Sequence, residues 1–462
     1  MSADYNHGMK KVIVVGGGLA GLSVAFRLLG HADVTVLEAD QRLGGNIHTT
    51  TSPDGFRVEW GPNGFLDGKP SLLQLCRDLG LGNQLLVASE GSRKNRYVFW
   101  NDQLTALPAS PLGILTTPLL STRGKFELLA EPLRGRGRDP SNESVTAFAT
   151  RRLGREACRV FMEALVTGIH AADPEKLSVA AAFPRLVAFE KQHRSVLRGF
   201  LASAKAKRKA VEAHGEKPLP QRMWSFRGGL REVIEALRHK LADRIETGIR
   251  VKRIVRIDGM NQVVLDGETR MADHVILACP AYEQARLLEA VPGAPSADLA
   301  AVEYNSIAVV ALGYRVEDAP LNPDGFGYIA PARLKRDAIG VQWCSSIFPD
   351  RAPPGFVLWR ALCGGALRPD VLGWDDETLL RNVHAEMMRI MKVTDHPKFS
   401  QIVRWPRAIP QYHLGHLERV QRIEAALQTV PGIHTAGNSL HGIALNDVVE
   451  RSNVVAATIL GG

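Results

Sequence analysis

The sequence predicts a mixed α/β fold, and three observations lead to that prediction. A β-branched run at Lys10–Val15 leads into a glycine-rich turn and then a helical apolar pattern, which is the order of a parallel βαβ unit. Short strand patterns recur between residues 248 and 280 and again between 302 and 362. From about Leu112 to Ala213 the spacing of apolar residues is helical instead. We therefore expect a parallel α/β domain, an antiparallel sheet and a helical insert.

Composition describes a soluble globular protein of several domains. The chain has 462 residues, of which 45% are hydrophobic and 23% are charged. This length exceeds one ordinary core, so we expect roughly two to three domains. The five cysteines are scattered and no two stand at metal-ligand spacing, so we expect neither a disulfide framework nor a metal site. The N-terminus has no leader pattern, and the expected location is the cytoplasm.

The first βαβ unit carries a dinucleotide-binding pattern. A Gly-x-Gly-x-x-Gly motif with Gly16, Gly18 and Gly21 follows the first strand, and the second strand ends at Glu38. The first glycine permits a tight turn, the second lets the backbone approach a pyrophosphate, and the third allows the helix to pack closely on the strand. The helix N-terminus attracts phosphates, and Glu38 can accept hydrogen bonds from ribose hydroxyls. The pattern predicts a Rossmann-like dinucleotide site.

The segment after Glu38 narrows the choice of dinucleotide. Arg42, Gly44 and Gly45 resemble the extended fingerprint of FAD enzymes of the amine-oxidase-like superfamily. The glycine pair would let backbone N–H groups reach the phosphates. Many members of that superfamily have an arginine after the glycine pair, and here Asn46 removes that contact. No cysteine follows Cys363, so a covalent link through a C-terminal cysteine is excluded and non-covalent FAD is the expected cofactor.

The rest of the chain predicts an interleaved organisation. Strand patterns at Gly248–Ile254, Met271–Pro280 and Gly432–Asn438 return to the first sheet, and a last helix starts within Gly442–Asp447. Patterns within residues 302–314, 325–330, 338–347 and 357–362 predict the antiparallel sheet. We expect an FAD-binding domain of residues 9–80, 222–285 and 405–462, a substrate-binding domain of residues 81–105 and 286–404, and a helical domain of residues 106–221.

The net charge of +9 leaves nucleic acid, an anionic membrane surface or acidic small molecules open as partners. Gln103–Thr122 is uncharged but contains three prolines, so we interpret it as a shallow membrane-surface patch or a buried loop, not a spanning helix. Lys191–Lys217 is predicted to be a basic helical stretch, either solvated or in contact with anionic headgroups. No recognition motif accompanies the charge, so we do not expect nucleic acid as a partner.

Several segments, in order along nearly the whole chain, resemble flavin-dependent protoporphyrinogen oxidases, most closely the myxobacterial-type and eukaryotic branch. The most specific is Ile-Pro-Gln-Tyr-x-x-Gly-His, which begins at Ile409. The other segments are Trp60–Asn63, Lys94–Tyr97, Thr167–Pro174, Leu177–Ser178, Phe348–Arg351 and Gly437–Asp447.

The resemblance implies oxidation of protoporphyrinogen IX to protoporphyrin IX, with six electrons leaving in three FAD-mediated steps and O2 reduced to H2O2. By resemblance, Arg96 binds a propionate, Asn63 lies beside that site, the backbone of Gly168 faces the macrocycle, and Ile329 and Leu362 are apolar walls. A guanidinium suits a carboxylate in an apolar cavity. The resemblance assigns further FAD contacts to Gly61, Pro62, Asn63, Val251, Trp405, Gly437, Asn438, Ile443, Ala444 and Leu445. It assigns no catalytic side chain, because the flavin carries the redox chemistry.

Other functions stay open at this point. Related bacterial enzymes oxidise coproporphyrinogen III to coproporphyrin III, and the sequence does not separate the two substrates. An amine oxidase is a more remote alternative, since Ala436–Gly442 lacks the aromatic residue and the glutamate that amine oxidases usually show there. Peripheral contact with the inner face of the cytoplasmic membrane and a homodimer are further hypotheses.

Overall fold

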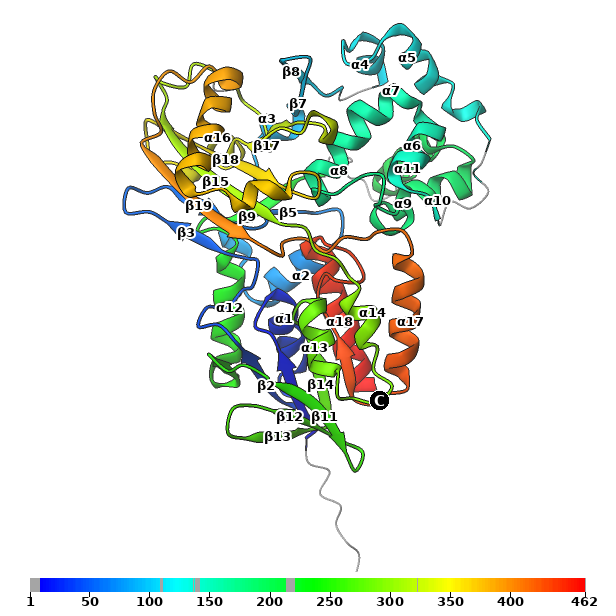
Figure 1. Cartoon of the computed structure of the whole chain (residues 1–462), viewed down its shortest axis with the longest axis vertical. Helices are drawn as coiled ribbons and strands as arrows, with labels where there is room; N and C mark the ends of the chain where they lie inside the picture. Colours follow the sequence, from blue (N-terminus) through cyan, green and yellow to red (C-terminus); the bar gives the residue numbers. More distant parts are fainter. Residues whose placement is uncertain are drawn as a thin grey trace, which may run out of the picture.

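The computed structural model describes residues 9–108, 111–135, 137, 142–212, 221–321 and 323–461. Figure 1 shows a lower body that holds both ends of the described chain, an upper body built on a large sheet, and a group of helices beside that sheet. The chain passes between these parts repeatedly, so segments distant in sequence meet in the same part.

A five-stranded parallel sheet forms the centre of the lower body. Its strand order is β10-β2-β1-β14-β20. The register pairs Val12 with Val34 on one side and with His274 on the other. The strands are β1 (Lys11–Val15), β2 (Asp33–Glu38), β10 (Ile245–Thr247), β14 (His274–Leu277) and β20 (Ile433–Thr435).

Helices cover both faces of this sheet, as a parallel sheet requires. Val12 and Val14 of β1 face one core and Ile13 and Val15 face the other, because successive side chains of a strand alternate. The first core is closed by α1 (Leu19–Leu28), α2 (Ser71–Asp78), α12 (Arg231–Leu241) and α18 (Leu445–Gly461). The second is closed by α13 (Ala281–Leu288), α14 (Ser296–Ala300), α17 (His416–Gln428) and the small sheet β11 (Arg253–Ile257), β12 (Met260–Val264) and β13 (Thr269–Ala272).

A seven-stranded sheet, of order β19-β15-β18-β17-β16-β7-β8, forms the upper body. All its neighbours are antiparallel except β16 and β7, which run parallel. The strands are β7 (Tyr97–Trp100), β8 (Gln103–Ala106), β15 (Ile307–Arg315), β16 (Gly327–Ile329), β17 (Ala338–Gln342), β18 (Phe356–Gly364) and β19 (Phe399–Trp405). Helix α16 (Asp376–Met391) covers one face, and the opposite face packs against Trp60 and Ala171.

The helices beside the sheet pack around a core of their own that includes Val145 and Phe148. A buried ion pair joins Glu131 to Arg152, and Ser195 also donates a hydrogen bond to the Glu131 carboxylate. The helical elements are α4 (Pro111–Thr116), α5 (Thr122–Leu129), η2 (Glu131–Leu133), α6 (Val145–Leu153), α7 (Arg155–Ala157), η4 (Cys158–Met162), α8 (Glu163–His170), α9 (Val179–Ala182), α10 (Pro184–His193) and α11 (Val196–Glu212).

Short strands and turns connect the three parts. Strands β3 (Thr49–Thr51) and β4 (Arg57–Glu59) form a ribbon, and β9 (Met223–Phe226) lies between β5 (Phe65–Leu66) and β6 (Leu85–Val87). The remaining short elements are η1 (Gly82–Gln84), α3 (Glu90–Lys94), η5 (Ala242–Arg244), η6 (Ala332–Leu334), α15 (Cys344–Ile347), η7 (Pro349–Arg351) and η8 (Pro369–Gly373).

Several predicted elements differ in detail. Gly248–Ile254 is not one strand, because Gly248 takes a positive φ of 74° and makes a turn between β10 and β11. Met271–Pro280 divides at Asp273 between two different sheets. The strand predicted to extend to residue 347 ends at Gln342 and gives way to α15.

The basic stretch Lys191–Lys217, predicted to be helical, is interrupted. Arg194 adopts a left-handed conformation and separates α10 from α11, and residues 213–217 lie outside the described part of the chain.

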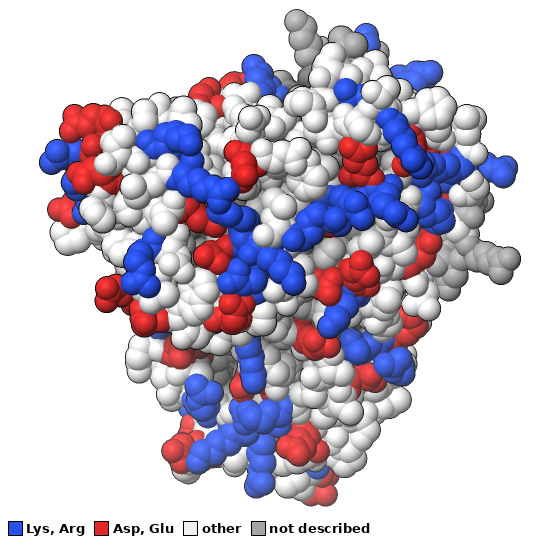
Figure 2. Space-filling model, turned by 45° about the horizontal axis from the view of Figure 1, so that its top comes forward, with Lys and Arg blue, Asp and Glu red and all other residues white. Residues whose placement is uncertain are grey.

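The surface shows how the charge of +9 is distributed. Figure 2 shows Lys and Arg side chains gathered into a band across one face of the upper half, with acidic side chains between them. Within the described residues, no helix is both long enough and apolar enough to cross a membrane. In Gln103–Thr122, Leu119 and Leu120 are buried, as the buried-loop interpretation predicts, while Leu115 is exposed.

Candidate functional site

The predicted dinucleotide residues meet at one edge of the parallel sheet. Gly16 follows β1, Glu38 ends β2, and Gly437 lies two residues after β20. The carboxyl ends of parallel strands lie at the same edge of a sheet, where ligands of α/β proteins bind. Residues separated by 400 positions therefore line one edge.

Close packing explains two of the glycines in the turn. Gly16 has a φ of 115°, and a Cβ on it would lie 3.0 Å from the carbonyl carbon and oxygen of Ala278. A Cβ on Gly21 would overlap the carbonyl oxygen of Gly16 and lie 3.1 Å from Val14 Cγ1. Any side chain on Gly21 would thus push α1 away from β1 and change the turn.

Glu38 closes the turn with two backbone hydrogen bonds. Its Oε2 accepts from the N–H of Gly17 at 2.6 Å, and its Oε1 accepts from the N–H of Asp40 at 2.9 Å. Gly18 is the N-cap of α1 and forms a parallel bridge with Gly44. The N-terminus of α1 therefore lies directly beside the glycine pair, where its free N–H groups and positive dipole attract phosphates.

Arg42 folds back on its own loop. Its guanidinium donates to the carbonyl oxygens of Leu43 at 3.1 Å, Ile47 at 3.1 Å and Gly45 at 2.7 Å. These bonds fix the loop in which Gly44 and Gly45 take positive φ values of 105° and 56°. Arg42 thus holds the shape of the loop that presents the glycine backbone.

A second chain segment, Gly61–Asn63, lies against this loop. A Cβ on Gly61 would overlap the carbonyl oxygen of Asn46, so the two backbones are in contact. Trp405, at the end of β19, donates its indole N–H to the carbonyl of Trp60 at 2.9 Å. The structure thereby brings Gly44–Asn46, Gly61–Asn63 and Trp405 together, as the predicted shared site requires.

Asn63 has an unpaired buried side chain. It is 5% exposed, and neither its amide nitrogen nor its amide oxygen has a hydrogen-bond partner within the described residues. A buried amide without partners is costly, and most such groups are satisfied by protein, water or ligand. Asn63 therefore fits a place where a polar group that is not part of the chain completes the site.

The N-terminus of α18 forms another wall of this edge. Ile443, Ala444 and Leu445 stand at its start and are half-buried or exposed, so they are accessible to a ligand. Tyr412 holds the preceding turn, because its hydroxyl donates to the carbonyl of Asn438 and accepts from the N–H of Gly442 at 2.8 Å.

Tyr412 is itself held by His416. The two rings stack with centroids 4.1 Å apart, and His416 also contacts the carbonyl of Leu440 through Nε2 at 3.1 Å. The Ile-Pro-Gln-Tyr-x-x-Gly-His segment thus positions the last turn before α18. Burial lowers the pKa of His416 to about 4, so the ring is neutral near pH 7.

Val251 lies further along the same edge, after the turn that follows β10. Its side chain is buried in the second core, and its carbonyl accepts from Arg286 at 3.0 Å. Two residues earlier, the N–H of Ile249 donates to the carbonyl of Glu38 at 2.9 Å. The backbone leading to Val251 is therefore tied to the acidic end of β2.

The predicted apolar walls lie in one row across the upper sheet. Ile329 of β16 and Leu362 of β18 are both paired with Gly340 of β17, and Leu362 is also paired with Val309. Directly opposite residues share a face of a sheet, so Ile329 and Leu362 project to the same side. Gly340 has no side chain, so β17 places no side chain between the two walls at this position.

Gly168 lies against this row from the helical side. A Cβ on Gly168 would be 2.5 Å from Ile329 Cδ1, which is closer than real Cβ contacts. Its helix, α8, ends at His170, and the carbonyl of the following residue, Ala171, accepts from Asn305 Nδ2 at 3.0 Å. The structure therefore brings together Gly168, Ile329 and Leu362, three residues predicted for the substrate.

Arg96 stands at the start of β7, next to this row. Val98 pairs with Ile329, and Arg96 is two residues before Val98. Because side chains of a strand alternate, Arg96, Val98 and Ile329 project to the same face of the sheet. Its guanidinium lies 4.7 Å from the centre of the Phe326 ring, and it has no ion-pair partner among the described residues. Arg96 is exposed, yet the surrounding protein displaces enough water to lower its pKa.

Sequence reasoning missed two residues that connect these regions. Arg360 of β18 is 2% exposed and donates to the carbonyls of Glu59 and Gly61 and to Gln342 Oε1. The sequence feature that could have identified Arg360 is that it is the one charged residue in the apolar run Phe356–Cys363. A fully buried arginine is rare unless it is paired, so an arginine in such a run indicates polar partners. Asn305 bonds to the carbonyls of His170 and Ala171 and to the N–H of Ile409, and no local pattern distinguishes it.

Comparison with known proteins agrees with this arrangement. The model of the flavin-containing amine oxidoreductase family matches residues 19–460. The protoporphyrinogen oxidase of Homo sapiens is 31% identical, covering 98% of each chain, and the coproporphyrinogen III oxidase of Bacillus subtilis (strain 168) is 28% identical, also covering 98% of each. A solved structure from Exiguobacterium sp. 255-15, provisionally described as a protoporphyrinogen oxidase, matches with a TM-score of 0.83 and 26% identity over 100% of this chain and 99% of that one. The chain belongs to the flavin-containing amine oxidoreductase family, and FAD is its cofactor.

Proposed function

We propose that this protein oxidises a porphyrinogen to the corresponding porphyrin. The observation that carries the proposal is the apolar row of Ile329 and Leu362, with Gly340 between them and Arg96, which has no ion-pair partner among the described residues, on the same face. A porphyrinogen has a broad apolar ring system and acidic side chains. An apolar surface with a guanidinium beside it matches both features.

We propose that FAD lies along the edge of the parallel sheet. The turn of Gly16, Gly18 and Gly21 and the N-terminus of α1 would hold the pyrophosphate, and Glu38 the ribose. Further contacts would come from the Arg42-braced loop with Gly44 and Gly45, and from Gly61, Pro62, Asn63, Val251, Trp405, Gly437, Asn438, Ile443, Ala444 and Leu445. When bound, FAD supplies the redox chemistry by taking up hydride equivalents and passing the electrons to O2.

The protein's own residues then bind and orient the substrate. Ile329 and Leu362 would contact the ring, the backbone of Gly168 would face it, and Arg96 would hold one carboxylate, with Asn63 beside that site. Conversion of a porphyrinogen to a porphyrin removes six hydrogen atoms. Three molecules of O2 accept them and become three molecules of H2O2, so atoms and electrons balance.

Protoporphyrinogen IX is the proposed substrate and coproporphyrinogen III the second candidate. The second is retained because the Bacillus subtilis relative that bears its name aligns over the same share of both chains as the human one. Coproporphyrinogen III has four propionates where protoporphyrinogen IX has two, so a preference for it would require more cations at the site than Arg96 alone.

An aerobic fluorescence assay tests the proposal. Purified FAD-loaded protein is mixed with each porphyrinogen, and the fluorescence of the porphyrin is followed against the rate without enzyme. We expect faster oxidation of at least one porphyrinogen, and the ratio of the two kcat/KM values identifies the preferred substrate. Rates equal to the uncatalysed reaction for both compounds contradict the proposal.

We further propose that the helical part, residues 106–221, contacts an anionic membrane surface, with the protein peripheral to the inner face of the cytoplasmic membrane. Exposed apolar side chains on it support this, notably Phe126 at 74% and Leu133 at 85% exposure. We also propose that the chain divides into an FAD-binding domain, a substrate-binding domain and this helical part. A homodimeric assembly is a further proposal, and sedimentation velocity measures the oligomeric state directly.

A further inference from the structure

A cavity of about 750 Å³ lies where the helical part meets the end of β7. It is distinct from the predicted substrate row, because Arg96 stands before β7 while Trp100, which lines the cavity, is its last residue. Four residues of extended strand span about 13 Å. None of the residues predicted to contact the porphyrinogen lines this cavity, so its lining points to a ligand of its own.

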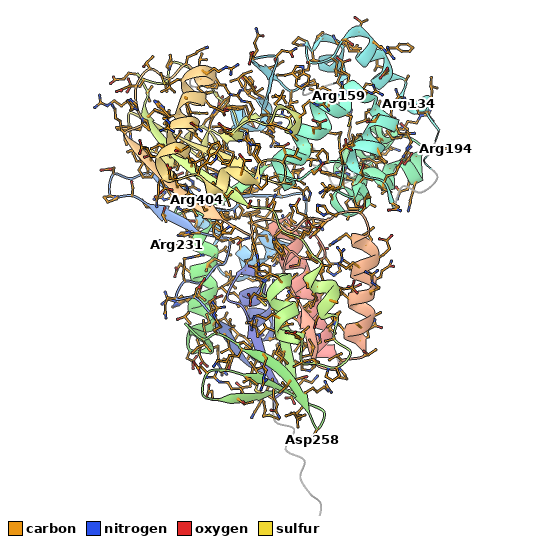
Figure 3. All side chains as sticks on the ribbon, in the orientation of Figure 1. Arg134, Arg159, Arg194, Arg231, Asp258 and Arg404 are labelled. Atoms are coloured by element: carbon orange, nitrogen blue, oxygen red, sulfur yellow. The ribbon has the colours of Figure 1, made fainter. Side chains whose placement is uncertain are left out.

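Arginines dominate the lining of this cavity. They outnumber the acidic residues of the lining, Glu127 and Glu156, by five to two. They come from four different segments, and Figure 3 labels two of them in the helical part. The five are Arg123, Arg134, Arg155, Arg159 and Arg333.

Three of the arginines already have acceptors. Arg123 pairs with Glu127 at 3.1 Å, and Arg333 pairs with Glu163. Arg134 donates to three carbonyl oxygens, including those of Glu127 and Arg151, both at 3.0 Å. Their charges remain at the cavity, but their donors are largely committed to the protein.

Arg155 and Arg159 differ, because neither has a hydrogen-bond or ion-pair partner within the described residues. They are exposed and stand four positions apart, Arg155 in α7 and Arg159 in the π-helical segment η4. Like charges at this spacing repel each other. The acid nearest in sequence, Glu156, is engaged by the N–H and hydroxyl of Ser121, both at 2.7 Å.

We propose that this cavity binds a phosphate group, with Arg155 and Arg159 as its principal ligands. Guanidinium groups that line one cavity from several segments suit a tetrahedral phosphate, which offers acceptor oxygens in several directions. The group can belong to a soluble phosphorylated compound or to the headgroup of an anionic lipid. The site is separate from the proposed oxidase site and does not depend on it.

The test compares two double variants of the FAD-loaded protein. R155Q/R159Q removes the two unpaired cations. K205Q/K209Q is the matched control, since these exposed lysines of α11 are also four positions apart in the helical part and carry the same total charge. Both variants should melt near the wild-type temperature, because all four side chains are exposed.

One arm titrates inorganic phosphate into each protein by calorimetry, and the other sediments each protein with vesicles of phosphatidylglycerol and phosphatidylcholine. We expect R155Q/R159Q to weaken binding about tenfold or more in at least one arm. K205Q/K209Q should match wild type in the phosphate arm, and in the vesicle arm it should lose less binding than R155Q/R159Q. Loss in the phosphate arm assigns a soluble ligand, and loss in the vesicle arm alone assigns a lipid headgroup. If the two variants behave alike in both arms, or the wild type binds in neither, the proposal is overturned. Neither readout uses enzyme activity, so failure of the phosphate-site proposal can be distinguished from failure of the oxidase proposal.

Discussion

The two halves of the site are built by different means. The dinucleotide edge depends mainly on backbone: glycines that permit close approach, two helix N-termini, and a loop fixed by Arg42. The proposed substrate row depends on side chains from separate strands and a helix, namely Arg96, Ile329, Leu362 and the contact at Gly168. A backbone site tolerates little change in its glycines, whereas a side-chain site can be altered residue by residue.

This difference predicts that mutations in the two halves have different effects. Changes at the sheet edge should remove FAD and with it all activity. Changes in the row should alter substrate handling while leaving FAD bound. Each of the following variants would break or sharpen that division.

The largest effect is expected for Gly21→Val. The new side chain would overlap the carbonyl of Gly16 and crowd Val14, so the turn and α1 would have to move. Overpacking of about 3 kcal/mol corresponds to roughly a hundredfold weaker FAD binding. Flavin absorbance of the purified protein measures it. Gly82→Val is the control, because a Cβ there meets nothing within 4 Å. Wild-type flavin content in Gly21→Val would contradict the placement of FAD at this turn.

Arg96→Ala should raise KM for the porphyrinogen about 10- to 100-fold, the value of one charge-assisted hydrogen bond. Flavin content should not change, because Arg96 lies on the upper sheet and not at the dinucleotide edge. Arg93→Ala is the nearby control, since Arg93 pairs with Glu90 on the surface. An unchanged KM would show that Arg96 does not bind the carboxylate.

Gly168→Ala should have a smaller effect. The added methyl group would approach Ile329 Cδ1, the flexible end of a side chain, so we expect kcat/KM to fall about three- to tenfold with FAD retained. Ile329→Val removes that methyl group. The double variant should therefore recover activity relative to Gly168→Ala alone, and simple additivity of the two losses would argue against this contact.

The smallest effect near neutral pH concerns two buried histidines, one in each half. Burial lowers the pKa of both His170 and His416 to about 4. The unfolded chain, with histidine pKa values near 6.5, then binds more protons than the folded chain between these values. The free energy of unfolding should be constant above about pH 6.5 and fall toward pH 4, by up to about 3 kcal/mol for each histidine.

Denaturant titrations at several pH values measure this slope. His170→Asn should make the slope shallower by the contribution of His170, whereas His239→Asn, on the exposed side of α12, should leave it unchanged. The same slope in His170→Asn and wild type would show that His170 does not resist protonation in the folded state.

The same contrast explains what could be predicted from the sequence. That Gly16, Gly21 and Glu38 lie together at one edge of the sheet could be predicted, because they belong to one local βαβ unit whose spacing has a physical meaning. The pairing of Ile329 with Gly340 and Leu362 depends on strand order, which no local pattern reveals, so these residues entered by family resemblance alone.

The residues that connect the two halves were the hardest to predict from the sequence. Arg360 and Asn305 join segments more than a hundred positions apart, through the carbonyls of Gly61 and His170. The strand predicted through Gly248 failed for a related reason, because the positive φ of that glycine makes a turn that hydrophobic spacing does not show.

Anaerobic mixing of the FAD-loaded protein with a porphyrinogen tests the joint action of both halves most directly. With O2 absent, the account predicts that the absorbance of the bound flavin decreases on mixing and that porphyrin forms in step with it. In Arg96→Ala the same decrease should require about 10- to 100-fold more substrate. Flavin absorbance that stays constant with both protoporphyrinogen IX and coproporphyrinogen III would contradict the account.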